Sequence, residues 1–262
     1  DPQLLTAGAL IGLVVGLTGV GGGALMTPAL VLIFGVAPIT AVGTDLWFAA
    51  LTKVAASRVH YRRGLIDGTV ARRLWAGSLP GAAIALAWLH VWGSGAPSGG
   101  ALRLGIGIAV LITALGLLLQ PTLLALVAGG STDPKRPPPS FQKAATVAAG
   151  AFVGAIVATT SVGAGALGAV LLAGLYPVRL TPPRLIATDI VHAIPLALLA
   201  GVGHLMLGSV DVGLLAQLLL GSIPAAVVGA LLCAHAPHPV LRVALCATLL
   251  VAGIKLLVPG QA

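Results

Sequence analysis

The stretch Thr18-Gly-Val-Gly-Gly-Gly-Ala-Leu25 recurs later in the chain as Thr160-Ser-Val-Gly-Ala-Gly-Ala-Leu167. Each copy interrupts a long apolar segment, 4–35 in the first case and 144–175 in the second. A straight helix crosses ~30 Å of hydrocarbon with ~20 residues, so each segment is too long for one crossing and too short for two. Because glycine readily leaves helical backbone angles, each segment is predicted to form two half-helices that meet at a glycine-rich break.

The two breaks belong to a longer internal repeat that relates residues 8–81 to residues 150–225. After a slip of two residues the repeat continues, and it pairs Thr44-Asp45 with Thr188-Asp189. Each copy therefore carries one aspartate inside an otherwise apolar stretch. Other repeated residues are His60, Gly64, Asp67 and Ser78, which correspond to His204, Gly208, Asp211 and Ser222.

The composition is that of a membrane protein. Hydrophobic residues make up 58% of the 262 residues and charged residues only 8%, whereas soluble domains carry about 25% charged residues. The 36 glycines and 18 prolines fit this class, because both residues are frequent in membrane helices. Apolar segments also span 41–57, 74–92, 102–128, 185–203, 212–233 and 240–258. We therefore expect an all-α polytopic membrane protein with six to eight membrane segments.

The basic residues indicate topology. They give a formal net charge of +8 but lie mainly in short loops, so nucleic acid is not an expected partner. Loop 58–73 contains five arginines, whereas its repeat counterpart, 204–211, contains no Lys or Arg. Basic loops favour the cytoplasmic side, so the two loops are predicted on opposite sides of the membrane and the repeats are predicted to be inverted.

The same argument favours re-entrant hairpins over fully crossing helices for 4–35 and 144–175. With hairpins, every Lys and Arg except Lys53, Arg103 and Lys255 lies on the cytoplasmic side. Residues 129–143 form the one strongly polar, proline-rich stretch and are predicted to be a cytoplasmic linker. The chain thus divides into a first membrane repeat, 1–128, the linker, 129–143, and a second membrane repeat, 144–262.

The breaks are candidate anion-binding elements. A break exposes backbone N–H groups at the start of a half-helix, where the helix dipole also attracts negative charge. Glycines can instead serve only close helix packing, the expected role of Gly8, Gly12 and Gly16. Residues 163–168 match G-x-G-x-x-G, but they lack the strand that precedes this motif in dinucleotide-binding folds. The candidate substrate-binding residues are Thr18, Gly21, Gly22, Gly23, Thr44, Thr160, Ser161, Gly163, Gly165 and Thr188.

Four ionisable residues inside apolar segments are candidates for ion coupling. A carboxylate within a membrane helix costs ~2.5–3.5 kcal/mol, so the repeated Asp45 and Asp189 are expected to have a role. Proton binding is one such role, and capping of a helix N-terminus is the alternative. Lys53 either pairs with Asp45 or supplies a positive field for an anion. His192, three residues after Asp189, is either a proton relay or simply a hydrogen-bonded histidine.

No catalytic motif or metal-ligand spacing is found in the sequence, so no enzyme activity, metal or cofactor is expected. Cys233 and Cys246 lie in apolar stretches and are expected to be packing residues. Small residues at four-residue spacing make a homodimer a possible assembly.

Residues 16–23, 41–46 and 163–168, in this order and duplicated around a proline-rich linker, resemble the sulfite exporter TauE/SafE family over nearly the whole chain. The resemblance implies an integral membrane protein that transports sulfur-containing anions such as sulfite and organosulfonates. Many members of the family carry Gly-Thr-Ser where this chain has Gly43-Thr44-Asp45. A carboxylate at this place repels an anion unless it is protonated or paired.

The expected function is therefore ion-coupled secondary transport of a small sulfur-containing anion by alternating access, in the plasma membrane of a prokaryote. The alternatives are a passive anion channel and an importer of another small organic or inorganic anion. The lipid bilayer and the anionic substrate are the expected partners.

Overall fold

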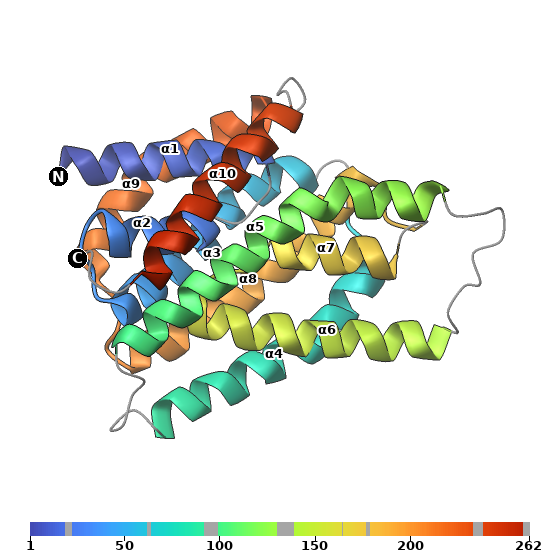
Figure 1. Ribbon diagram of the computed structural model, residues 1–262, viewed down its shortest axis with the longest axis horizontal. Coiled ribbons are helices and arrows are strands. Elements are labelled where there is room, and N and C mark those ends of the chain that lie inside the picture. Colours follow the sequence, from blue (N-terminus) through green and yellow to red (C-terminus); the bar gives the residue numbers. More distant parts are fainter. Residues whose placement is uncertain are drawn as a thin grey trace.

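The computed structural model describes residues 1–18, 23–61, 64–91, 99–129, 139–163, 165–176, 179–232 and 238–258, which contain ten helices and no strand. Figure 1 shows these helices running roughly along the long axis of the molecule. In chain order they are α1 (Pro2–Thr18), α2 (Gly23–Leu32), α3 (Pro38–Tyr61), α4 (Gly68–Val91), α5 (Gly99–Gly129), α6 (Pro139–Thr160), α7 (Ala166–Leu175), α8 (Pro182–Met206), α9 (Val212–Leu232) and α10 (His238–Leu257).

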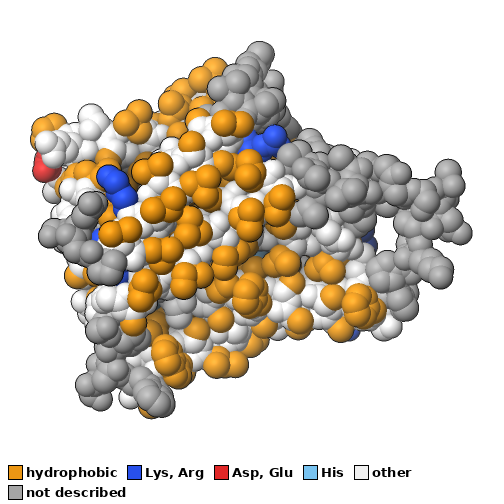
Figure 2. Space-filling model, viewed as in Figure 1, with side chains coloured by type: hydrophobic (Ala, Val, Ile, Leu, Met, Phe, Trp, Pro, Cys, Tyr) orange, Lys and Arg blue, Asp and Glu red, His pale blue; other side chains and the backbone are white. Residues whose placement is uncertain are grey.

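Five helices in the described part of the chain are long and apolar enough to cross a membrane. They correspond to Gly68–Val91, Gly99–Leu119, Ser140–Thr160, Arg184–Met206 and Val212–Leu232. Large apolar side chains also cover the outside of the molecule, for example Leu104 and Ile108 on α5 and Ile254 on α10 (Figure 2). Such a surface fits a lipid environment. The prediction of an all-α polytopic membrane protein is confirmed.

Both long segments that carry a glycine-rich stretch are broken as predicted. In the second half, α6 ends at Thr160 and α7 begins at Ala166. The Gln142 side chain, near the start of α6, donates a hydrogen bond to the carbonyl of Leu175 at the end of α7 (2.6 Å). The two helices therefore fold back on each other as a hairpin. In the first half, α1 ends at Thr18, and α2 runs back toward the side where α1 begins (Figure 1).

The first hairpin of each half packs against the other half of the chain. Gly8 and Gly12 of α1 lie so close to Leu218 and Ser222 of α9 that an added Cβ would overlap the α9 backbone. Gly150 and Gly154 of α6 lie equally close to Leu74 and Ser78 of α4. In each pair, a residue later in one helix contacts a residue later in the other helix. Helix α1 therefore runs parallel to α9, and α6 runs parallel to α4. Glycine permits this close approach of the backbones.

Helices α3 and α8 form the centre of the molecule. Trp47 of α3 donates its indole N–H to the carbonyl of Gly201 on α8 (2.9 Å), while Gly43 of α3 faces His204 of α8. The later residue on α3 contacts the earlier residue on α8, so these two helices are antiparallel. They bring the two repeated aspartates into the interior. The predicted linker, 129–143, lies mostly outside the described residues, and α6 begins inside its C-terminal part at Pro139.

Candidate functional site

Asp45 and Asp189 are both buried in the interior of their helices. Their exposed fractions are 0% and 2%, and they lie well inside α3 and α8. Neither carboxylate therefore caps the helix that carries it. A buried carboxylate is costly unless neighbouring groups compensate it, so the surroundings of the two aspartates define a candidate site.

Asp45 lies between α2 and the second glycine-rich break. Its Oδ2 accepts a hydrogen bond from the hydroxyl of Thr27, the fifth residue of α2 (2.5 Å). The hydroxyl of Ser161, in the second break, is directed toward the same carboxylate but completes no hydrogen bond. The other oxygen, Oδ1, has no hydrogen-bond partner within the described structure. Asp45 therefore has spare acceptor capacity at the point where the two breaks approach each other.

Asp189 occupies the corresponding position in the second half. A Cβ placed on Gly168, in the first turn of α7, would overlap Oδ1 of Asp189. The first turn of α7 has no side-chain cap, because Gly165 is its N-cap residue. Asp189 therefore lies beside the first turn of α7, where the helix dipole favours negative charge, and Asp45 contacts the N-terminal half of α2. Oδ1 of Asp189 likewise has no hydrogen-bond partner among the described atoms.

Lys53 and His192 complete the group. Lys53 of α3 is only 2% exposed, and it interacts electrostatically with both Asp45 and Asp189. Nε2 of His192 lies 2.9 Å from the hydroxyl of Ser78 on α4, while its Nδ1 is buried with no hydrogen-bond partner in the described structure. The structure thus brings together the four ionisable residues that the sequence predicted for ion coupling. We call Asp45, Lys53, Asp189, His192 and Ser161 the central site.

The second break has an unusual backbone. Ser161, Gly163 and Gly165 have φ angles of 59°, 114° and 136°, in the left-handed range that favours glycine. The Thr160 hydroxyl holds the bend, because it donates to the carbonyl of Ile156 (2.7 Å) and accepts from the N–H of Val162 (3.2 Å). The two breaks also touch, since a Cβ on Gly23 would overlap the carbonyl oxygen of Ser161.

Among the residues that the structure describes, four buried polar atoms of the central site lack a hydrogen-bond partner: Asp45 Oδ1, Ser161 Oγ, Asp189 Oδ1 and His192 Nδ1. Buried polar atoms without partners are rare in folded proteins. Their concentration at one place, contributed by both halves of the chain, makes the central site the candidate binding site.

The remaining predicted residues lie around this centre. The Thr188 hydroxyl accepts the N–H of Asp67, and the Thr44 hydroxyl accepts the N–H of Asp211, both at 3.0 Å. Their direct contact with a substrate remains a prediction. Thr18 is the last residue of α1, and Gly21 and Gly22 lie outside the described residues.

Three residues that lie against the central site are not among the residues predicted from the sequence. Ser78 carries a detectable signal, because it recurs as Ser222 in the repeat. Thr27 has no such signal, since its counterpart in the second copy is Ala169. Gly168 belongs to the G-x-G-x-x-G match, which gives no sign of its closeness to Asp189, because that closeness depends on how α7 packs against α8.

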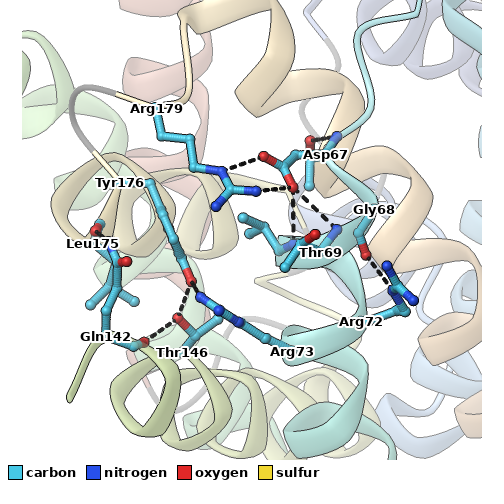
Figure 3. Close-up of polar contacts among 12 residues, drawn as sticks. Asp67, Gly68, Thr69, Arg72, Arg73, Gln142, Thr146, Leu175, Tyr176 and Arg179 are labelled. Carbon is cyan, nitrogen blue, oxygen red and sulfur yellow. Dashed lines mark hydrogen bonds and ion pairs between the residues drawn. The ribbon is translucent and has the colours of Figure 1, made fainter. Parts of the chain in front are cut away.

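A second polar cluster lies where α4 and α8 begin (Figure 3). Arg179 donates two hydrogen bonds to Asp67, from Nε to Oδ2 (2.6 Å) and from Nη2 to Oδ1 (3.0 Å). Burial alone acts to raise the pKa of Asp67, but the hydrogen bonds from Arg179 and from the N–H groups of Val70 and Thr69 outweigh it and hold this pKa below its ordinary value. Asp67 is therefore ionised at neutral pH.

This lowered pKa predicts a loss of stability in acid. A carboxylate whose pKa is lowered on folding contributes stability above its unfolded pKa, and the contribution disappears as the pH falls through the folded value. The thermal midpoint of the native protein in detergent is expected to exceed that of Asp67→Asn at neutral pH, with the difference shrinking only below about pH 4. A difference that stays constant down to pH 3 would contradict this assignment.

Comparison with known proteins agrees with this architecture. Residues 4–256 match the family model described as "Sulfite exporter TauE/SafE". The chain is 34% identical over 262 residues to the "Probable membrane transporter protein YjnA" of Bacillus subtilis (strain 168), and the match covers 97% of this chain and 99% of that protein. No solved structure matches the chain. The family match over nearly the whole length and the identity to the Bacillus protein together show that this chain belongs to the sulfite exporter TauE/SafE family of membrane transporters.

Proposed function

We propose that this protein is an ion-coupled secondary transporter that carries a small sulfur-containing anion, such as sulfite or an organosulfonate, by alternating access. The observation that carries the proposal is the central site, where polar atoms without partners from both halves converge beside a buried lysine. The ammonium group of Lys53 and the N-terminal turns of α2 and α7 supply the positive potential that an anion needs in a low-dielectric interior. The TauE/SafE family model supports the class of substrate.

The directions of the helices support an inverted relation between the two halves. Helix α1 runs parallel to α9 and α6 runs parallel to α4, while the corresponding central helices α3 and α8 are antiparallel. The opposite directions of the corresponding helices α3 and α8 are those expected for inverted repeats. Inverted repeats with broken helices that meet at a central site are a recurrent arrangement in secondary transporters. The bacterial relative supports the plasma membrane of a prokaryote as the location. The face that carries Arg72, Arg73 and Arg179, called the arginine-bearing face below, is expected on the cytoplasmic side.

The charges of the central site suggest how coupling works. Two carboxylates and one ammonium group leave one excess negative charge, which opposes the entry of an anion. Proton binding to Asp45 or Asp189 removes this excess and leaves Lys53 to attract the substrate. His192 lies three residues after Asp189 and is placed to exchange that proton. Protonation and anion binding then favour each other, which is the thermodynamic definition of coupling.

Asparagine in place of either aspartate tests this function. In liposomes with an imposed pH gradient, Asp45→Asn and Asp189→Asn are each expected to reduce gradient-driven accumulation of sulfite by ~5–150-fold, the range of a coupling free energy of ~1–3 kcal/mol. Asp211→Asn, which changes an exposed aspartate outside the site, serves as the matched control. Accumulation that stays pH-driven at the native rate in both variants would remove the acids from coupling.

The same assay separates the two alternatives. A passive channel gives flux that ignores the gradient and does not saturate with substrate, whereas a carrier saturates. An importer of another anion gives gradient-driven uptake that excess sulfite does not inhibit.

A further inference from the structure

We propose that the ion pair between Asp67 and Arg179 is a latch that holds the arginine-bearing face of the protein closed over the central site. This inference rests on the proposed alternating access, because a latch has a role only if this face opens and closes. The two residues come from different halves of the chain, since Asp67 precedes α4 and Arg179 lies between α7 and α8. Movement of the two halves away from each other at this face therefore requires the ion pair to break.

The latch is built on a well-anchored carboxylate. Asp67 is 7% exposed, and its Oδ1 accepts hydrogen bonds from the N–H groups of Thr69 (3.1 Å) and Val70 (3.2 Å) in the first turn of α4. Arg179 approaches it in a bidentate manner and remains 47% exposed. Bidentate pairing fixes geometry as well as charge. The half-exposed arginine is thus the partner that is free to leave, while the aspartate stays in place.

A second set of hydrogen bonds holds the same face together (Figure 3). The Tyr176 hydroxyl, next to α7, lies 3.1 Å from Nη1 of Arg73 on α4 and 2.8 Å from the hydroxyl of Thr146 on α6. Thr146 in turn donates to the carbonyl of Gln142 (2.6 Å). These contacts join α4 of the first half to α6 and α7 of the second half beside the ion pair.

The latch is also connected to the central site. The backbone N–H of Asp67 donates to the hydroxyl of Thr188 (3.0 Å), and the next residue in α8 is Asp189. A shift of α8 that accompanies a change at Asp189 is therefore transmitted by one hydrogen bond to the residue that holds Arg179.

The opposite face has an aspartate, Asp211, that corresponds to Asp67, but it has no counterpart of the ion pair between Asp67 and Arg179 among the described residues. Asp211 caps α9 through the N–H of Leu214 (2.9 Å), and its own N–H donates to Thr44, the residue before Asp45. No basic side chain is present at the turn that corresponds to the one containing Arg179, which reads Gly35-Val-Ala-Pro38. The other hydrogen-bonding residues also differ between the two copies of the repeat. Tyr176, Arg73 and Thr146 correspond to Phe34, Gln217 and Leu4, which cannot form the same contacts. The two faces are thus closed by different forces.

This asymmetry supplies a matched pair of variants. Asp67→Asn and Asp211→Asn both keep a side-chain oxygen that caps the following helix, but only Asp67→Asn removes an ion pair. In a background without Cys233 and Cys246, a reporter cysteine at Ser161 is exposed to a membrane-impermeant maleimide from one face of sealed vesicles at a time. Ser78→Cys serves as a second reporter if Ser161→Cys does not fold.

We expect Asp67→Asn and Arg179→Gln each to raise the labelling rate from the arginine-bearing face by ~2–5-fold, the size expected for a half-exposed ion pair. Labelling from the opposite face is expected to fall, and Asp211→Asn is expected to leave both rates unchanged. The double variant Asp67→Asn/Arg179→Gln is expected to match either single variant, because both remove the same interaction.

Equal labelling in Asp67→Asn and Asp211→Asn, or additive effects in the double variant, would overturn the latch. The measurement needs neither substrate nor flux. A native chain that carries no anion in liposomes but follows the expected labelling pattern would therefore refute the proposed function while leaving the latch in place.

Discussion

Replacing Lys53 by methionine is expected to lower the free energy of unfolding by ~3–5 kcal/mol, the cost of leaving buried charges without compensation. Lys53 is almost fully buried and interacts with the carboxylates of both Asp45 and Asp189. Methionine fills a similar volume but leaves two carboxylates in the interior without a positive charge. Thermal unfolding in detergent, followed by tryptophan fluorescence, measures the loss.

Two further variants make the Lys53 result specific. Lys255→Met changes an exposed lysine on α10 and is expected to shift stability by no more than ~0.5 kcal/mol. Lys53→Met/Asp189→Asn removes one of the two carboxylates left behind and is expected to recover part of the loss. A Lys53→Met protein as stable as the Lys255→Met protein would show that the lysine does not compensate the two acids.

Replacing Gly23 by alanine is expected to separate the two glycine-rich breaks and to abolish anion transport. The added Cβ would overlap the carbonyl oxygen of Ser161, and a backbone atom cannot move aside as a flexible side chain can. Overpacking of this kind costs ~1–3 kcal/mol. The greater effect is on function, because Ser161 also faces Asp45, so the central site is displaced with the break. Sulfite flux into liposomes and thermal unfolding measure the two effects separately.

Gly174→Ala is the control for this change. Gly174 lies near the end of α7, and nothing surrounds the position where its Cβ would be. Alanine there is expected to keep transport and to raise stability slightly, by up to ~1 kcal/mol, because alanine favours the helix more than glycine does. If Gly23→Ala transported sulfite at the rate of Gly174→Ala, close contact between the breaks would not be needed for transport.

The broken helices and the buried acids could be predicted because each leaves a local mark on the sequence. Glycines inside an apolar segment mark the break at residues 160–167, and a carboxylate in the same setting marks Asp45 and Asp189. Repetition strengthened both signals, since a feature that recurs at the same place in two copies is hard to attribute to chance. The grouping of Lys53 and His192 with these acids also followed from helical spacing.

The partners of these residues could not be predicted, because they depend on packing between segments that are distant in sequence. Thr27 reaches Asp45 only because the turn between α2 and α3 reverses the chain. Ser78 reaches His192 only because α4 packs on α8, across the two halves. The pairing of Asp67 with Arg179 likewise joins positions far apart in the chain. The repeat does not predict this pair, because no equivalent pair of residues exists in the other copy.

The packing of α1 along α9 has a consequence for how the protein is made. Helix α1 leaves the ribosome before the other nine described helices, but its partner α9 begins only at Val212, about 190 residues later. At ~5–20 residues per second this delay is ~10–40 s. During that time the glycine-lined side of α1 has no native neighbour, whereas α4 and α6 can join soon after each is synthesised. We therefore expect α4 and α6 to assemble before α1 and α9, and α1 to be held in place only after α9 has been synthesised.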